Sequence, residues 1–147
     1  MRALLLLTLV AACASHRHEP AAHPEDKDRL YVELDVERGH QRPLGDGARA
    51  GLAKVPFVVV TPRNRGGDME LQVQVARLDV VGQETVCNIK ILALRLPQHD
   101  LFGMAEGTAR AGGTHDQASN DCIERLGESL MGGKVRALLH QRLGEKR

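Results

Sequence analysis

The chain has 147 residues, 42% of them hydrophobic, with 20 Lys and Arg against 19 Asp and Glu and a net charge of +1. That length fits one domain. A charge so close to zero gives no field that would attract nucleic acid, and the only aromatic residues are Tyr31, Phe57 and Phe102. Stacking platforms for bases or sugars are therefore scarce, and we expect no nucleic-acid partner.

The first residues have the pattern of an export signal. Arg2 is followed by an apolar run over residues 3–10 and by the small residues Ala11 and Ala12, which precede Cys13. A bilayer core of about 30 Å needs a longer helix, at about 1.5 Å per residue, so we expect no permanent membrane helix here.

Val10-Ala11-Ala12-Cys13 resembles the lipobox of bacterial lipoproteins. The resemblance implies that residues 1–12 are a signal peptide and that the mature chain begins at a lipidated Cys13. Ala14 differs from the Asp that retains lipoproteins in the inner membrane of enteric bacteria, which implies the outer membrane. The alternative is ordinary cleavage at Ala12-Cys13-Ala14, which would remove Cys13 and release a soluble periplasmic protein.

Residues 13–28 contain little that could form a core and are interpreted as a flexible tether. A metal site is the alternative interpretation of this segment. A metal requires a preformed cage with supporting partners, so we favour a linker with incidental histidines. The polar residues concerned are His16, His18, His23, Glu19, Glu25 and Asp26.

Strand patterns begin at Leu30, where apolar and polar residues alternate through Glu37. Glycines and Pro43 between Gly39 and Gly47 are expected to break the chain, and residues 48–54 allow a short helix. A strand over 55–61 then leads, through a hairpin turn at Asn64–Asp68, into a meander.

The pattern predicts three further strands. Residues 71–81 switch their apolar face near Ala76-Arg77, which indicates a β-bulge, and residues 85–96 have the pattern of a buried, central strand. In residues 103–111 every second residue is Gly or Ala, which predicts either close packing of a helix or, as the less favoured alternative, a binding groove.

A C-terminal helix should follow, capped by Thr114 or Ser119 and interrupted at Gly132-Gly133, with a last short helix ending by Gly144. Its predicted apolar stripe consists of Cys122, Ile123, Leu126, Ser129 and Leu130.

The two remaining cysteines are predicted to join these elements. Cys87 lies on one face of a strand and Cys122 on the apolar stripe of the helix expected to cover that face. If Cys13 carries lipid, these two form an even pair in an oxidising compartment, which favours a disulfide. Two buried free thiols or a redox pair are the alternatives, although the chain has no Cys-x-x-Cys motif.

The C-terminal half resembles a group of lipoprotein-like proteins from myxobacteria. The resemblance rests on Thr85–Ile91, on Pro97, on the small-residue strand Phe102–Gly113 and on Asn120-Asp121-Cys122-Ile123. It implies a shared disulfide fold and no activity.

No catalytic signature stands out. The chain contains no Gly-x-Ser-x-Gly elbow, Walker loop or Gly-x-Gly-x-x-Gly motif. His115, Asp116 and Ser119 resemble a triad only by composition and are better explained as a helix cap. His99-Asp100 and His115-Asp116 would form a metal site if the fold brought them together, but loop polarity explains both pairs equally well.

We therefore expect one α+β domain over residues 29–147, with two layers. A mostly antiparallel sheet of four or five strands carries the C-terminal helix on one face, stapled by Cys87 and Cys122. The expected role is that of an exported, lipid-anchored envelope protein that binds or scaffolds another envelope protein, with no catalytic residues, metal or cofactor. The alternative is a small exported metal-dependent enzyme that uses the His-Asp pairs.

Overall fold

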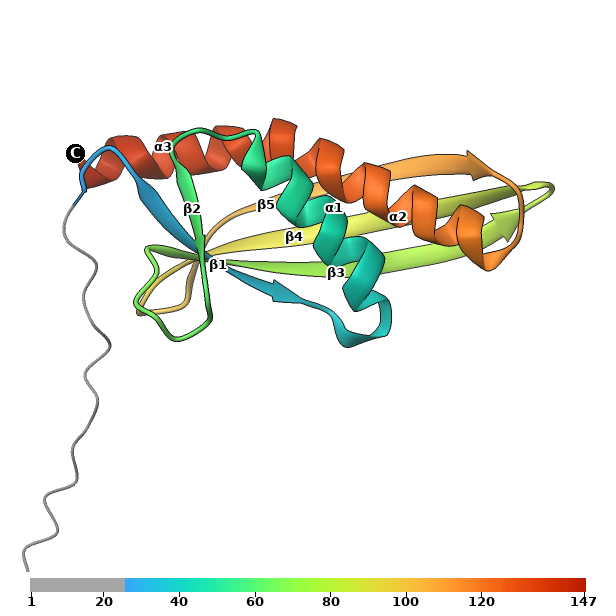
Figure 1. Ribbon diagram of the computed structural model, residues 1–147, viewed down its shortest axis with the longest axis horizontal. Helices are drawn as coiled ribbons and strands as arrows, with labels where there is room; N and C mark the ends of the chain where they lie inside the picture. The colour runs from blue at the N-terminus through green and yellow to red at the C-terminus, as the bar shows by residue number, and fades with distance from the viewer. Residues whose placement is uncertain (1–25) are drawn as a thin grey trace, which may run out of the picture.

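A computed structural model describes residues 26–147, which form an α+β domain with a five-stranded open sheet (Figure 1). The strands lie in the order β2-β1-β3-β4-β5. Their bounds are Leu30–Val36 (β1), Val58–Thr61 (β2), Met69–Val81 (β3), Glu84–Arg95 (β4) and Asp100–Gly112 (β5). The helices are Gln41–Ala53 (α1), Asp116–Leu130 (α2) and Arg136–Lys146 (α3), with a 3-10 turn at Arg38–His40 and a π-helical turn at Met131–Val135.

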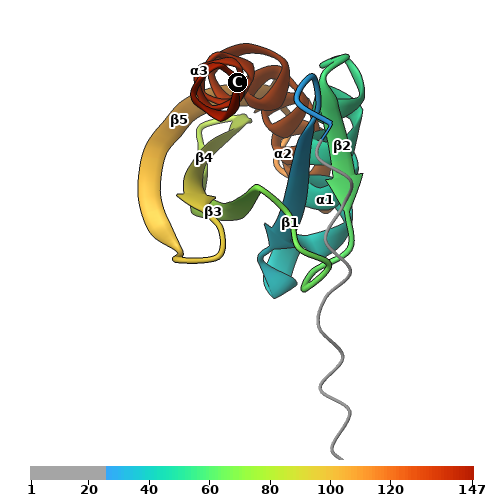
Figure 2. The ribbon, with the colours of Figure 1, turned by 90° about the vertical axis from the view of Figure 1, so that its left-hand side faces the viewer.

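The core lies between one face of the sheet and the helices, around which the strands curve (Figure 2). The alternation in β1 buries Leu30 and Val32, and the same pattern in β4 buries Ile89 and Ile91. Each of these side chains is at most 1% exposed. The predicted two-layer α+β class with a C-terminal helix on one face is confirmed.

The connection of the first strands differs from the expected meander. β2 pairs in parallel with the first half of β1, and β3 pairs in parallel with its second half, on the other side. The predicted hairpin at Asn64–Asp68 is therefore wrong. Turn residues indicate that a chain changes direction, but they do not specify which strand the next segment will pair with. β3, β4 and β5 form the long antiparallel part of the sheet.

Helix α1 includes residues that were expected to break the chain. Pro43 lies in its first turn, where its missing N–H costs no helical hydrogen bond. Gly47 and Gly51 face α2, and a Cβ on them would lie 2.2 Å from the Glu124 carbonyl oxygen and 2.5 Å from that of Glu128. These glycines therefore allow two helices to touch backbone to backbone.

The longer strands follow the sequence pattern. The β3 register shifts between Val75 and Arg77, as the predicted bulge requires. β4 has a neighbour on each side, although β3 is the middle strand. On β5, a Cβ at Gly103 would lie 2.8 Å from Leu138 Cδ2 and one at Gly107 would lie 2.9 Å from Leu130 Cδ2. The small-residue face of β5 therefore packs against helices and forms no groove there.

The C-terminal helices differ from the prediction in four details. His115 caps α2 in place of Thr114 or Ser119, since its Nδ1 accepts from Ala118 N at 3.1 Å. Gly132-Gly133 lies in a π-helical turn that joins α2 to α3 without a break. α3 continues past Gly144 to Lys146, and Ser129 is exposed while Gly127 takes its place in the core.

Candidate functional site

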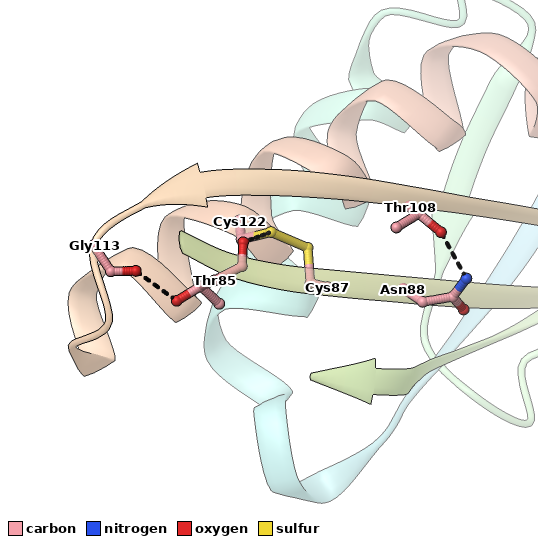
Figure 3. Close-up of a disulfide and its surroundings, with 6 residues drawn as sticks. All are labelled: Thr85, Cys87, Asn88, Thr108, Gly113 and Cys122. Atoms are coloured by element: carbon pink, nitrogen blue, oxygen red, sulfur yellow. Dashed lines mark hydrogen bonds between the residues drawn. A yellow bond between two sulfur atoms is a disulfide. The ribbon is translucent and has the colours of Figure 1, made fainter. Parts of the chain in front are cut away.

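The predicted disulfide is present and buried between β4 and α2 (Figure 3). Cys87 is 0% and Cys122 is 2% exposed, and their Cα atoms lie 6.2 Å apart. Next to the bridge, Thr85 Oγ1 donates to the Gly113 carbonyl at 2.8 Å and ties the end of β5 to β4. Because both sulfurs are bonded and buried, neither is a free nucleophile, and their role is to pin helix to sheet.

Several predictions fall outside residues 26–147. Lipidation of Cys13, the signal peptide and the histidines of the proposed tether (His16, His18 and His23) are among them. They remain predictions from the sequence.

The two His-Asp pairs do not form one site. His99 lies in the β4–β5 turn and His115 lies after β5, at the other end of this 13-residue strand (Figure 1). At about 3.3 Å per residue the pairs are separated by roughly 40 Å. Within the described residues, no group of three or more His, Cys, Asp or Glu side chains is arranged to hold a metal.

Asp100, His115 and Ser119 each have a local structural partner. Asp100 accepts from Arg95 Nη1 at 3.1 Å, and the imidazole of His115 is used as the cap of α2. The Ser119 N–H donates to the His115 carbonyl at 3.2 Å, as in an ordinary helical turn. The triad interpretation of His115, Asp116 and Ser119 therefore has no support, and the helix-cap interpretation is confirmed for His115.

A cavity lies at the other end of the sheet, beneath a loop that crosses β1. β2 ends at Thr61, opposite Glu33, and β3 starts at Met69, opposite Val32 on the other side of β1. Residues 62–68, the crossing loop, must therefore pass over β1 at the level of Glu33. This loop buries Glu33 on the sheet face that the helices leave uncovered.

The Glu33 carboxylate holds the crossing loop through its backbone. Oε2 accepts from Asn64 N at 2.9 Å and Oε1 accepts from Gly67 N at 3.1 Å. A Cβ on Gly67 would lie 2.8 Å from Glu33 Cγ, so this close approach requires glycine. Glu33 is 5% exposed as a result.

Glu70 lies beside Glu33, since the two residues are register partners on β3 and β1. It is 3% exposed and has three side-chain partners. His99 Nδ1 lies 3.0 Å from Oε2, while Arg63 Nη2 and Gln72 Nε2 lie 3.5 Å and 3.2 Å from Oε1. Arg63 also reaches Asp35 Oδ1 at 3.1 Å.

The cavity between the crossing loop and the β4–β5 turn has a volume of about 450 Å³. It is lined by Glu33, Asn64, Gly66, Gly67, Leu96, Pro97 and His99. Asn64 and His99 have positive φ angles of 61° and 59°, and non-glycine residues in this conformation are concentrated at functional sites. The cavity therefore combines a buried carboxylate, an imidazole and an apolar wall.

The β4–β5 turn beside the cavity is fixed by charged groups on its two strands. The pKa of Arg95 is raised, chiefly by its hydrogen bond with Asp100 and further by the charge of Glu145. The Arg95 guanidinium also lies over the Phe102 ring, 4.7 Å from its centre. This turn carries His99 to its place beside Glu70.

Sequence reasoning singles out His99 but not its contact with Glu70, and it misses Glu33 and Glu70. Both glutamates occupy polar positions of alternating strands, where exposure is the normal expectation. Only the crossing loop buries Glu33, and the crossing depends on the parallel pairing of three strands. The one local signal is Gly66-Gly67, whose composition equally favours a hairpin turn.

The uncovered sheet face also carries exposed apolar side chains. On β5, Leu101 is 60% and Met104 is 52% exposed. Among residues 26–147, no helix is long and apolar enough to cross a membrane.

Comparisons with known proteins show the fold and no family. No protein-family model matches the chain, and no curated protein matches its sequence. Protein XCC0632 from Xanthomonas campestris, of the DUF330 family, is similar with a TM-score of 0.58 and 13% identity, over 86% of this chain and 94% of that one. A dodecamer of PelC from Paraburkholderia phytofirmans has a TM-score of 0.50 and 14% identity, over 76% and 90%.

A third structure, lipoprotein GNA1162 from Neisseria meningitidis, has a TM-score of 0.48 and 12% identity, over 76% of this chain and 96% of that one. The similarity to XCC0632 and to PelC shows that these chains share an α+β fold. Identities this low transfer no activity.

Proposed function

We propose that this protein is exported across a bacterial inner membrane, anchored by lipid at Cys13, and acts in the envelope as a non-enzymatic binding or scaffolding module. The observation that carries the proposal is the buried bridge between Cys87 and Cys122. Disulfides persist in oxidising compartments such as the periplasm, which agrees with the export pattern of residues 1–12.

Binding in place of catalysis is supported by two features of the described residues. The His-Asp pairs that a metal-dependent enzyme would use lie at opposite ends of β5. Leu101 and Met104 are exposed on a sheet face that no helix covers, and exposed apolar side chains gathered on one surface are typical of interaction sites. The partner we propose is another envelope protein, with the membrane reached through the lipid and no nucleic acid bound.

Metabolic labelling with a radioactive fatty acid tests the anchor. We expect the exported protein to incorporate label and to sediment with outer-membrane vesicles, and Cys13→Ala to lose both properties. Export of an unlabelled, soluble wild-type chain whose mature N-terminus lies beyond Cys13 would show that ordinary signal cleavage operates and that the lipid anchor is wrong.

Self-assembly is a second candidate for the scaffolding role. It is favoured by the structural similarity to PelC, which forms a dodecamer, and by the exposed Leu101 and Met104 on the edge strand β5. Light scattering of the purified protein should then show an oligomer that Leu101→Glu with Met104→Glu dissociates. Val80→Glu, at an exposed position at the opposite end of the sheet from Leu101, is the control, and a monomeric wild type at micromolar concentration contradicts this candidate.

A further inference from the structure

We propose that the cavity beneath the crossing loop binds a primary alkylammonium group, with Glu33 as its counter-ion. The ligand chemistry is an –NH₃⁺ head on an unbranched hydrocarbon chain, supplied either by a free alkylamine or by a lysine side chain of another protein. This site goes beyond the envelope role, because it does not require the lipid anchor or the apolar patch on β5.

Two neighbouring carboxylates at the cavity end differ in their partners. Glu70 has the guanidinium of Arg63 at 3.5 Å and the imidazole of His99 at 3.0 Å. Glu33, its register partner, accepts only from the backbone N–H groups of Asn64 and Gly67 and has no cationic partner within residues 26–147. A carboxylate removed from water is costly unless a cation neutralises it, so Glu33 offers an unfilled cation position.

A hydroxyl without a hydrogen-bond partner lies beside the Glu33 carboxylate. Thr61 is the register partner of Glu33 on β2, so both side chains leave the sheet on the same face. Thr61 is 7% exposed, and its Oγ1 has no hydrogen-bond partner in the part of the chain that the structure describes. Buried hydroxyls are normally hydrogen-bonded, so a second polar group next to Glu33 is left unsatisfied, on the side of β1 away from the cavity lining.

The wall of the cavity opposite the Glu33 carboxylate is apolar. Leu96 and Pro97 line the cavity from the β4–β5 turn and present hydrocarbon to its interior. A volume of about 450 Å³ is within the range of small-molecule sites. The cavity therefore matches a ligand that is charged at one end and apolar along its length. A quaternary ammonium, which has no N–H to donate, matches it less well.

Nuclear magnetic resonance of the exported, oxidised protein tests this proposal with n-butylammonium as the probe. The backbone amides of Asn64 and Gly67 donate to Glu33, so they should shift saturably as the probe binds. Tetramethylammonium should bind at least tenfold more weakly. Absence of a saturable shift at these two amides, or equal binding of tetramethylammonium, would overturn the proposal.

Two variants separate binding at Glu33 from general attraction to carboxylates. Glu33→Gln should weaken n-butylammonium binding at least tenfold. Glu37→Gln should leave it unchanged, since Glu37 also accepts a backbone N–H, from Val75 at 2.8 Å, but does not line this cavity. The amide spectrum of each variant reports whether it folds, and His99→Gly provides a second test, since it changes the cavity wall while Glu33 is retained. Unchanged affinity in Glu33→Gln, or affinity in His99→Gly equal to the wild type, would overturn the site.

Two further probes identify the source of the ammonium group. A diamine such as putrescine that binds at least tenfold more tightly than n-butylammonium indicates a free polyamine. Tighter binding of Nα-acetyl-lysine methylamide indicates a lysine side chain of a protein partner. Either result supports an ammonium site at Glu33. If both probes bind and Glu33→Gln weakens neither of them, the proposal is overturned.

Discussion

The two ends of the β3–β5 ribbon are held by different chemistry. At one end, the Cys87–Cys122 bridge and the Thr85 hydroxyl join β4 to α2 and to the end of β5 in an apolar setting. At the other end, the crossing loop and the β4–β5 turn are held by Glu33 and Glu70 through hydrogen bonds and ion pairs.

The two ends of the sheet therefore have different roles: one stabilises the fold and the other carries the candidate ligand site. The stapled end is closed, since its two sulfurs are buried and Leu126 and Leu130 of α2 pack against Gly107 of β5. The cavity end keeps a buried charge and an open volume, which a domain optimised only for stability would replace with apolar packing. We therefore expect substitutions at the stapled end to lower the free energy of unfolding the most, and substitutions at the cavity end to change ligand binding.

The largest expected effect comes from removing the staple. Cys87→Ala with Cys122→Ala should lower the free energy of unfolding by about 4 kcal/mol, the chain-entropy value for a bridge that spans 35 residues. Urea denaturation of the oxidised protein measures it, with Cys13→Ala as a control that should leave the midpoint unchanged. A loss below about 1 kcal/mol would contradict the expectation that the stapled end contributes the most stability.

The next effect concerns the close approach of the crossing loop to β1. In Gly67→Ala the new Cβ would lie 2.8 Å from Glu33 Cγ, and overpacking of this kind costs about 2 kcal/mol. Gly144→Ala is the matched control, since nothing lies within 4 Å of its new Cβ and alanine favours a helix. Urea denaturation should show a loss for Gly67→Ala and a small gain for Gly144→Ala. Equal midpoints would show that the loop yields easily.

The stapled end was largely predictable from the sequence, and the cavity end was not. Cys87 and Cys122 occupy apolar positions of a strand and a helix whose local periodicity is clear, and the Gly-Ala alternation of β5 predicts the close packing of helices. These signals are local. Glu33 and Glu70, in contrast, are buried because three strands pair in parallel and a loop crosses between them.

Helix α1 shows a second limit of local reasoning. Gly47 and Gly51 resemble breakers because glycine is a poor helix former, but their function depends on α2, which lies far away in the sequence. Packing against a helix distant in the sequence can therefore place glycine inside a helix, despite its low helix propensity.

A smaller effect is expected at the stapled end from the backbone conformation of Gly113. Gly113 has a φ of 102°, and its carbonyl accepts from Thr85, so Gly113→Ala should cost about 1–2 kcal/mol of stability. Its neighbour gives the control: nothing lies within 4 Å of a Cβ on Gly112, whose φ is not positive, so Gly112→Ala should be neutral within about 0.5 kcal/mol. A Cβ on Gly113 would also lie 3.3 Å from Ala118 Cβ, so the loss combines backbone conformation with close packing. Thermal unfolding of the two variants measures the difference, and similar melting temperatures would contradict the assignment.

The smallest effect is the coupling between Arg63 and Glu70 at the cavity end. Glu70 is buried, but the Arg63 side chain is 57% exposed, so solvent screens the pair. A double-mutant cycle with Glu70→Gln and Arg63→Gln should give a coupling of about 0.5–1 kcal/mol. The exposed pair of Arg77 and Asp79 is the control, with an expected coupling near zero because both partners are solvated. If the two cycles agree, burial of Glu70 adds nothing to its ion pair. A larger coupling at Glu70 shows that Arg63 neutralises this carboxylate and leaves Glu33 as the charge available to a ligand.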